Sequence, residues 1–210
     1  MGLKTKLMAI FSLLSVMILA VSSIAGYTFT KKQVQQNIQN ELKATETAGL
    51  NKLDGWLISK AKILEMTSAT LKSSMGDEEP SVANLAGFKI ADKELSDVYV
   101  GTESGKMIDG SGWVAPKDYD PRIRAWYKTA IQENRLVFTD PYFDQVTKKM
   151  AVAVAMPIID STGKTSGIIS QDILLKTLVS NVGALNLNGQ GNALLIDKKG
   201  LLLAYPDTRY

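Results

Sequence analysis

The sequence predicts an α+β protein, with an apolar N-terminal helix, a long stalk helix, and then an antiparallel sheet flanked by helices. Three observations lead to this prediction. The chain has no charged residue at positions 7–30. Apolar residues then recur at steps of three and four as far as residue 74, and beyond it short β-rich runs alternate with turn residues. At 210 residues, the chain has room for an anchor and one domain of ordinary size.

The uncharged run at 7–30 is long enough to be a transmembrane helix. At about 1.5 Å per residue it can cross a hydrocarbon core of roughly 30 Å. Two lysines lie in the predicted cytoplasmic N-terminus at 1–6, although two more at 31–32 weaken this orientation. A cleaved signal peptide is the alternative, since residues 23–25 have a small-x-small pattern. We favour a retained anchor because the run is long and leads into a continuing helix.

Residues 31–74 are predicted to form a long amphipathic stalk helix, with Gly49 as a candidate bend. The segment has no proline, and its apolar stripe consists of Val34, Ile38, Leu42, Leu53, Trp56, Leu57, Leu64 and Leu71. Such a stripe either packs on the helix's own domain or pairs with a second copy of the chain. Both arrangements can hold over different parts of the helix, and we favour a stalk that forms a homodimer.

Residues 75–84 break the helical pattern with glycine, proline and three consecutive acidic residues. The predicted strands that follow cover residues 97–100, 106–108, 136–138, 149–159 and 166–173, with a last hairpin at 192–205. One helix is predicted to start at Asp120, where proline follows a capping residue, and another covers 174–182. The buried face of the first is predicted to contain Ile123, Trp126, Tyr127, Ala130 and Ile131.

Composition argues against most enzyme classes. The chain contains no histidine and no cysteine. Histidine-dependent triads, histidine-ligated zinc and thiol chemistry therefore cannot be built from these residues. The net charge is only +3 and the basic residues are dispersed, which does not suit a nucleic-acid-binding surface. We expect no catalytic activity, no cofactor, no metal and no nucleic-acid partner.

The residues at 119–142 contain a candidate site for a small zwitterion. The Arg124 guanidinium suits a carboxylate, and the surrounding aromatic rings and phenol oxygens suit an ammonium. Arg124 and Trp126 would lie on nearly opposite sides of a regular helix, so one pocket can contain both only if the helix begins at or after Arg124. Asp172 is expected at the end of a strand, where it either caps the next helix or holds the ammonium. Three more acids are expected to form local turns, namely Asp118, Asp140 and Asp144.

These spacings match a known family. The chain resembles the double-Cache (PAS-like) sensor domains of bacterial transmembrane receptors, above all methyl-accepting chemotaxis proteins, and within them the amino-acid-binding subgroup. The matching positions are Tyr119, Arg124, Trp126, Tyr127, Tyr142 and Asp172. The resemblance implies that Tyr119, Arg124 and Trp126 bind the ligand carboxylate. It implies that Tyr127, Tyr142 and Asp172 bind the amino group.

The resemblance also implies a location and a role. We expect one N-terminal span in the bacterial inner (cytoplasmic) membrane and a periplasmic or extracellular sensor that binds a free amino acid for chemotaxis. Residues 75–210 would be the membrane-distal module, and the chain would stop before the membrane-proximal module and the signalling part. Two alternatives remain at this point: a sensor of carboxylates or amines from a histidine kinase or cyclase, and a dimeric anchor fragment that binds nothing.

Overall fold

The computed structural model describes residues 2–75, 78–185, 192–196 and 200–205. The chain divides into two compact units, Met1–Ala48 and Gly49–Tyr210. One continuous helix, α1 (Leu3–Met75), runs through the boundary between them. Gly49 lies within this continuous helix, and the bend at Gly49 stays a prediction.

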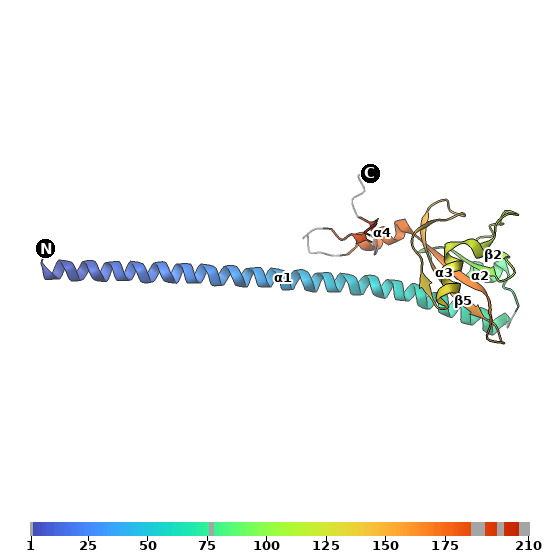
Figure 1. The fold of residues 1–210 in the computed structure, drawn as a ribbon, viewed down its shortest axis with the longest axis horizontal. Coiled ribbons are helices and arrows are strands. Elements are labelled where there is room, and N and C mark those ends of the chain that lie inside the picture. The colour runs from blue at the N-terminus through green and yellow to red at the C-terminus, as the bar shows by residue number, and fades with distance from the viewer. Residues whose placement is uncertain (1, 76–77, 186–191, 197–199, 206–210) are drawn as a thin grey trace. The chain divides into compact units, whose positions relative to one another are not determined.

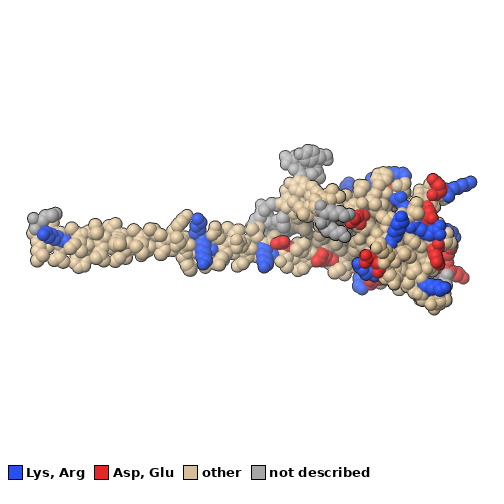
Figure 2. Space-filling view, in the orientation of Figure 1, with Lys and Arg blue, Asp and Glu red and all other residues tan. Residues whose placement is uncertain are grey.

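The first unit consists of the N-terminal part of α1. Nearly all of its described residues are exposed. Helix α1, which begins in this unit, is the one helix of the described chain that is long and apolar enough to span a membrane, with a mean hydropathy of 2.5 over an 18-residue window. Figure 2 shows the uncharged part of this helix, residues 7–30, as a segment with basic residues on either side. A signal sequence near the N-terminus meets the same criteria of length and composition, so the retained anchor at 7–30 remains a prediction.

The second unit is built on an antiparallel sheet with the strand order β2-β1-β6-β5-β3, and β4 also pairs with β5 (Figure 1). Its strands are β1 (Leu95–Thr102), β2 (Met107–Asp109), β3 (Val137–Phe138), β4 (Tyr142–Phe143), β5 (Met150–Ile159) and β6 (Thr165–Leu174). The helices are α2 (Val82–Ala91), α3 (Ala125–Glu133) and α4 (Leu175–Gly183), with a short 3-10 helix η1 (Pro121–Ile123). A separate hairpin pairs β7 (Leu195–Ile196) with β8 (Leu202–Ala204). The predicted α+β class is confirmed.

The two faces of the sheet have different partners. One face packs against α1 and α2 through a core of aliphatic side chains that includes Leu64, Leu85 and Ile169. The other face packs against α3 in a cluster that includes Tyr99 and Trp126. The sequence of strand β5 explains the difference between the two faces. Alanine and valine alternate along it, and successive side chains of a strand point to opposite faces, so the alanines lie on one face and the valines on the other. The small alanines leave room for the aromatic residues on the α3 side, where the candidate site lies.

Several predicted elements need correction. Ile123 is exposed because it belongs to η1, before the helix, and Ile131 is exposed because it lies one residue beyond the buried Ala130 and is turned toward solvent. The sequence patterns above do not predict helix α2. Its start is marked by Ser81, whose side chain and that of Asn84 form a capping box. Strand β4 is not predicted either, since it has only two residues.

Gly101 on β1 is expected to tolerate no larger side chain. A Cβ atom there would lie 2.7 Å from Cη2 of Trp126 and 2.8 Å from Cβ of Pro121. We expect Gly101→Ala to cost roughly 1–3 kcal/mol of stability and to lower the Tm by about 3 °C or more. Thermal unfolding followed by circular dichroism measures this. The control is Gly87→Ala on α2, where a Cβ meets nothing within 4 Å and the helix should gain stability. Equal Tm values for the two variants would contradict the packing described here.

Candidate ligand-binding site

A small pocket lies on the α3 side of the sheet. It is lined by Tyr99, Met107, Asp109, Trp113, Tyr119, Arg124, Trp126, Tyr142, Asp144, Gln145, Val146 and Asp172. Five of the six predicted site residues are among them, and Tyr127 is not. The free volume is about 10 Å³, the space of roughly one water molecule. A larger ligand can enter only if lining side chains move apart.

The turn before α3 places Arg124 and Trp126 in the same pocket. The Asp120 side chain accepts a hydrogen bond from the backbone N–H of Arg122 and caps η1, which starts with Pro121. Arg124 then has extended backbone angles, with φ −76° and ψ 148°, and α3 begins at the next residue. The regular helix therefore begins after Arg124, as a pocket shared with Trp126 requires. The helix start predicted at Asp120 is wrong for α3, because Asp120 and Pro121 open only the 3-10 helix η1. Because Arg124 lies outside the helix, it does not have to point away from Trp126.

The Arg124 side chain is a cation without an anionic partner among the described residues. Its Nε is buried and has no hydrogen-bond acceptor in that part of the chain, and its guanidinium lies 5.9 Å from the centre of the Tyr119 ring. Arg122, two residues earlier, is exposed and pairs with Asp120 at 2.8 Å. The two arginines therefore differ in whether an acid neutralises their charge. Arg122 is neutralised locally, whereas Arg124 offers unused N–H donors to an anion in the pocket.

Asp172 lies inside β6 rather than at its end, and it faces the pocket. The alternative of a helix cap is wrong, since the N-cap of α4 is Leu174 and has no side-chain hydrogen bond. The carboxylate accepts hydrogen bonds from the Tyr99 hydroxyl at 2.7 Å and from the Tyr142 hydroxyl at 2.6 and 2.7 Å. Burial raises the pKa of Asp172 to about 7, although both hydroxyls oppose this rise.

Tyr142 fills the space beside this carboxylate. Strand β4 positions it through its pairing with Ala151, whose small side chain leaves room for the ring. Burial, and then the charge of Asp172, raise the pKa of the Tyr142 phenol, so the hydroxyl stays protonated as a donor. A ligand ammonium would make the same kind of hydrogen bond to Asp172 and add a full positive charge.

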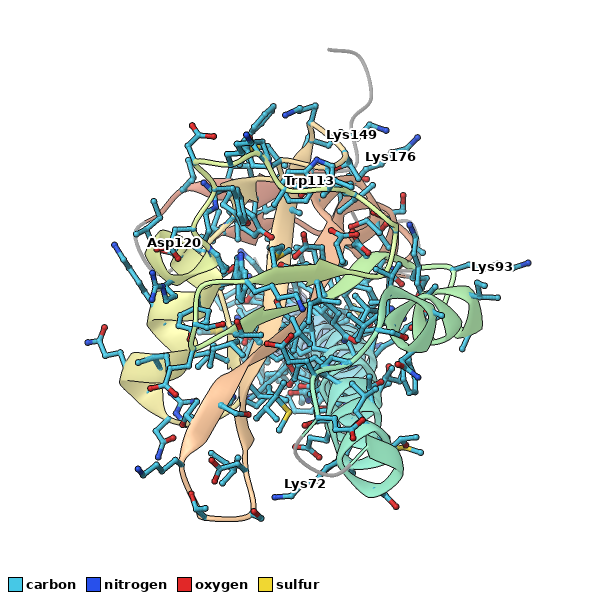
Figure 3. All side chains as sticks on the ribbon, turned by 90° about the vertical axis from the view of Figure 1, so that its right-hand side faces the viewer. Lys72, Lys93, Trp113, Asp120, Lys149 and Lys176 are labelled. Atoms are coloured by element: carbon cyan, nitrogen blue, oxygen red, sulfur yellow. The ribbon has the colours of Figure 1, made fainter. Side chains whose placement is uncertain are left out.

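The aromatic residues form the walls around Arg124. Trp126 is buried, and its ring meets the Tyr99 ring edge to face at 5.0 Å. The Trp113 ring meets the Tyr119 ring in the same way at 5.1 Å. Figure 3 shows Trp113 on a loop at one end of the sheet. Burial raises the pKa of the Tyr119 phenol, and the charge of Arg124 opposes this. Each wall therefore combines an apolar ring with a polar atom near the pocket.

Tyr127 does not turn toward Asp172 as predicted. It is buried, and its hydroxyl donates to the backbone carbonyl of Thr102 at 3.5 Å. The reason is geometric. Tyr127 follows Trp126 in a regular helix, so the two rings are rotated by roughly 100° from each other. Only Trp126 reaches the pocket wall, and Tyr127 packs against it at 5.6 Å between ring centres.

Sequence reasoning missed several lining residues. Tyr99 and Asp109 are brought to the pocket by the pairing of β1 with β2, and Trp113 by the loop that follows. Asp144 forms a turn, as predicted, by accepting from the backbone N–H groups of two residues that follow it, Val146 and Thr147. It also lines the pocket. The available signal for Tyr99 is the alternation in β1, which places it on the face opposite its two valine neighbours.

The charges around the pocket are mostly negative. Asp97 and Asp109 are each 1% exposed, and an oxygen of each lacks a hydrogen-bond partner among the described residues. Burial, and then the charge of Asp109, raise the pKa of Asp97. The described residues that line the pocket include three acids and one cation. The acids are Asp109, Asp144 and Asp172, and the cation is Arg124. The pocket therefore suits a ligand that brings one positive group together with an anion.

Comparison with known proteins shows which class of protein has this fold and site. Residues 67–180 match the family described as "Methyl-accepting chemotaxis protein-like, first PDC sensor domain". The match covers more than half of the chain, and the chain belongs to this family of receptor sensor domains. The resemblance inferred from the sequence is confirmed.

Individual relatives are chemotaxis receptors. The chain is 25% identical over 209 residues to the methyl-accepting chemotaxis protein PscA of Pseudomonas syringae pv. tomato, covering 100% of this chain and 33% of PscA. It is 34% identical over 123 residues to McpC of Bacillus subtilis, covering 58% of this chain and 19% of McpC. The chain thus spans about a third or less of the length of these relatives.

Solved structures show the same fold. The ligand-binding domain of the Pseudomonas aeruginosa amino-acid chemoreceptor PctC, in complex with GABA, has a TM-score of 0.67 and 28% identity, covering 80% of this chain and 76% of that one. The ligand-binding domain of the Pseudomonas fluorescens chemoreceptor CtaA, in complex with L-valine, has a TM-score of 0.71 and 24% identity, covering 82% and 76%. The predicted Cache-type fold is confirmed.

The buried Asp172 predicts how the stability of the protein depends on pH when no ligand is added. Its pKa rises from 3.8 to about 7 on folding, so the folded state holds the proton more tightly than the unfolded state. The stability that Asp172 contributes is complete below its unfolded pKa of 3.8, and it is lost as the pH rises through the folded pKa of about 7. Between these two pH values, Asp172 alone lowers the free energy of unfolding by at most about 1.4 kcal/mol per pH unit. We expect Asp172→Asn to flatten that decline in urea titrations between about pH 5 and 7.

The exposed Asp160 provides the control for this experiment. Hydrogen bonds, the first from Thr162, lower its pKa, so Asp160→Asn should leave the slope above about pH 5 unchanged. An unchanged slope in Asp172→Asn would contradict the burial of this carboxyl group.

Proposed function

We propose that this chain is the extracytoplasmic sensor segment of a bacterial chemoreceptor and that its pocket binds a free amino acid. One observation carries the proposal. The unpaired guanidinium of Arg124 and the buried carboxylate of Asp172 line the same small pocket among the described residues. An α-amino acid has an anion and a cation on one carbon atom, and these two side chains complement that pair.

The proposed pose follows from the donors and acceptors present. The ligand carboxylate takes the free N–H donors of Arg124, and the Tyr119 hydroxyl and Trp126 indole N–H stand beside it as further donors. The ligand ammonium binds Asp172, and Tyr142 moves aside from the carboxylate or shares it. For Tyr127 we propose an indirect contribution, in which its ring supports Trp126 from behind.

The relatives support this ligand class. The solved domains with this fold include PctC in complex with GABA, CtaA in complex with L-valine and PctB in complex with L-arginine. These ligands all combine a carboxylate with an amino group and differ elsewhere. A pocket that fixes the two charged groups and leaves the remainder to other lining residues is consistent with such variety. We propose that the chain binds its ligand without catalysing a reaction.

We further propose the membrane arrangement expected from the sequence. Residues 1–6 would be cytoplasmic, 7–30 would span the bacterial inner membrane once, 31–74 would form the stalk, and 75–210 would be the membrane-distal module outside the cytoplasm. Within the first unit the apolar stripe is exposed at Val34, Ile38 and Leu42. A second copy of α1 would cover it, which supports a homodimer through the stalk.

Calorimetry with a panel of amino acids tests the proposed function. The chain is inserted into lipid nanodiscs, its fold is verified by circular dichroism, and each common amino acid is titrated into it. We expect at least one to bind with a Kd of about a millimolar or tighter. A folded protein that binds none of them would contradict the proposal.

A further inference from the structure

The residue next to Asp172, Gln171, is a polar side chain in the apolar core. Adjacent residues of a strand point to opposite faces, so Gln171 faces α1 while Asp172 faces the pocket. Gln171 is 0% exposed, and it lies between Val98 and Val154 on the neighbouring strands. These two valines belong to the aliphatic cluster that packs against α1. An amide in this position needs an explanation, because a leucine of similar size would pack there without any polar group.

The amide of Gln171 holds α1 through a single hydrogen bond among the described residues. Its Nε2 donates to the backbone carbonyl of Lys60, at 2.7 Å. Its Oε1 is buried and has no hydrogen-bond partner in the same part of the chain. An unpaired buried acceptor costs stability, so stability alone does not account for glutamine here. The bond does connect β6, the strand that carries Asp172, directly to α1.

A second series of contacts also joins Lys60 of α1 to strand β6. The Lys60 side chain is buried and pairs with Asp92 at 2.5 Å and with Glu94 at 2.6 Å. These acids lie just before β1. Two residues after Glu94, the Ser96 hydroxyl donates to the backbone carbonyl of Asp172 at 3.2 Å. One route therefore joins Lys60 directly to Gln171, and the other joins it to Asp172 through the start of β1.

We propose that Gln171 is a positioning residue that couples the ligand-binding Asp172 to helix α1 at Lys60. The inference rests on the proposed function. When a ligand ammonium binds Asp172 and shifts Tyr142, the backbone of β6 adjusts, and Gln171 adjusts with it because the two residues are covalently adjacent. The hydrogen bond to the Lys60 carbonyl then changes the local stability of α1. By linkage, an interaction that lets the ligand change α1 also lets α1 change the affinity for the ligand.

Hydrogen exchange of the full chain in nanodiscs tests the coupling. The probe is the amino acid from the calorimetric panel that binds best, and the readout is amide exchange in residues 57–68. In the wild type we expect saturating ligand to change this exchange rate by about twofold or more. In Gln171→Leu we expect the ligand to bind within about fivefold of the wild-type affinity while the exchange response disappears. A residue that was merely structural would not separate binding from response.

Lys72→Met is the matched control. The Lys72 Nζ donates to the backbone carbonyl of Ile159 at 2.6 Å, so this variant also removes a bond between α1 and a strand. Figure 3 shows Lys72 at the opposite end of the sheet from Trp113, which lines the pocket. We expect Lys72→Met to keep both the ligand affinity and the exchange response at residues 57–68.

The possible outcomes separate the coupling from the proposed function. A wild type that binds ligand without an exchange response, or a Gln171→Leu variant that keeps the response, would overturn the coupling and leave the proposed function intact. A wild type that binds no amino acid would overturn both. If Gln171→Leu does not fold, Gln171→Met removes the amide with a more flexible side chain and is judged by the same criteria.

Discussion

Replacing Arg124 with alanine is expected to weaken amino-acid binding by about a hundredfold or more, and this is the largest effect that we predict. The guanidinium is the only cation among the described residues that line the pocket, and its Nε has no partner among them. Removing it would leave the ligand carboxylate buried without a counter-charge, which costs about 3–5 kcal/mol for a buried ion pair. Calorimetry with the best-binding amino acid measures the loss.

Arg122→Ala is the matched control for this variant. Arg122 is two residues away, has the same charge and pairs with Asp120 outside the pocket. We expect its removal to change the affinity by less than about threefold, because exposed ion pairs contribute little. If the two alanine variants lost affinity equally, Arg124 would not be a specific partner of the ligand carboxylate.

Asp172→Asn is expected to have the second largest effect, again about a hundredfold loss of affinity for amino acids. Asparagine keeps the size of the side chain and removes the negative charge that an ammonium needs. The same variant should bind a ligand's deaminated carboxylate as well as the wild type does. This comparison also separates the proposed function from the alternative of a sensor of simple carboxylates. The ligand affinity of such a sensor would not fall when Asp172 is neutralised.

Most of the fold could be predicted from local patterns. The alternating alanine and valine residues of β5 predict a strand with two different faces, and the turn at Asp160 predicts the return of the chain in β6. The start of α3 could be predicted in part. Asp120 and Pro121 are typical of a helix start, and the need to place Arg124 and Trp126 together required that the regular helix begin later. The structure has this arrangement.

The site could be predicted only in part, because its remaining contacts are not local. Tyr99 reaches Asp172 through the pairing of β1 with β6, and no spacing within one segment reveals that pairing. The direction of Tyr127 depends on the packing of α3 against β1. Asp172 was expected at a strand end, whereas β6 continues two residues beyond it, to Leu174. Short elements such as β4 have too few residues for a periodic pattern.

One measurement tests the central claim most directly, namely that Arg124 and Asp172 hold the two charged groups of one amino acid. The best-binding amino acid is compared by calorimetry with its methyl ester, which lacks the carboxylate charge, and with its N-acetyl form, which lacks the ammonium. We predict that each change weakens binding to the wild-type chain by about a hundredfold or more. An ester or an N-acetyl derivative that binds as tightly as the parent amino acid would contradict the account.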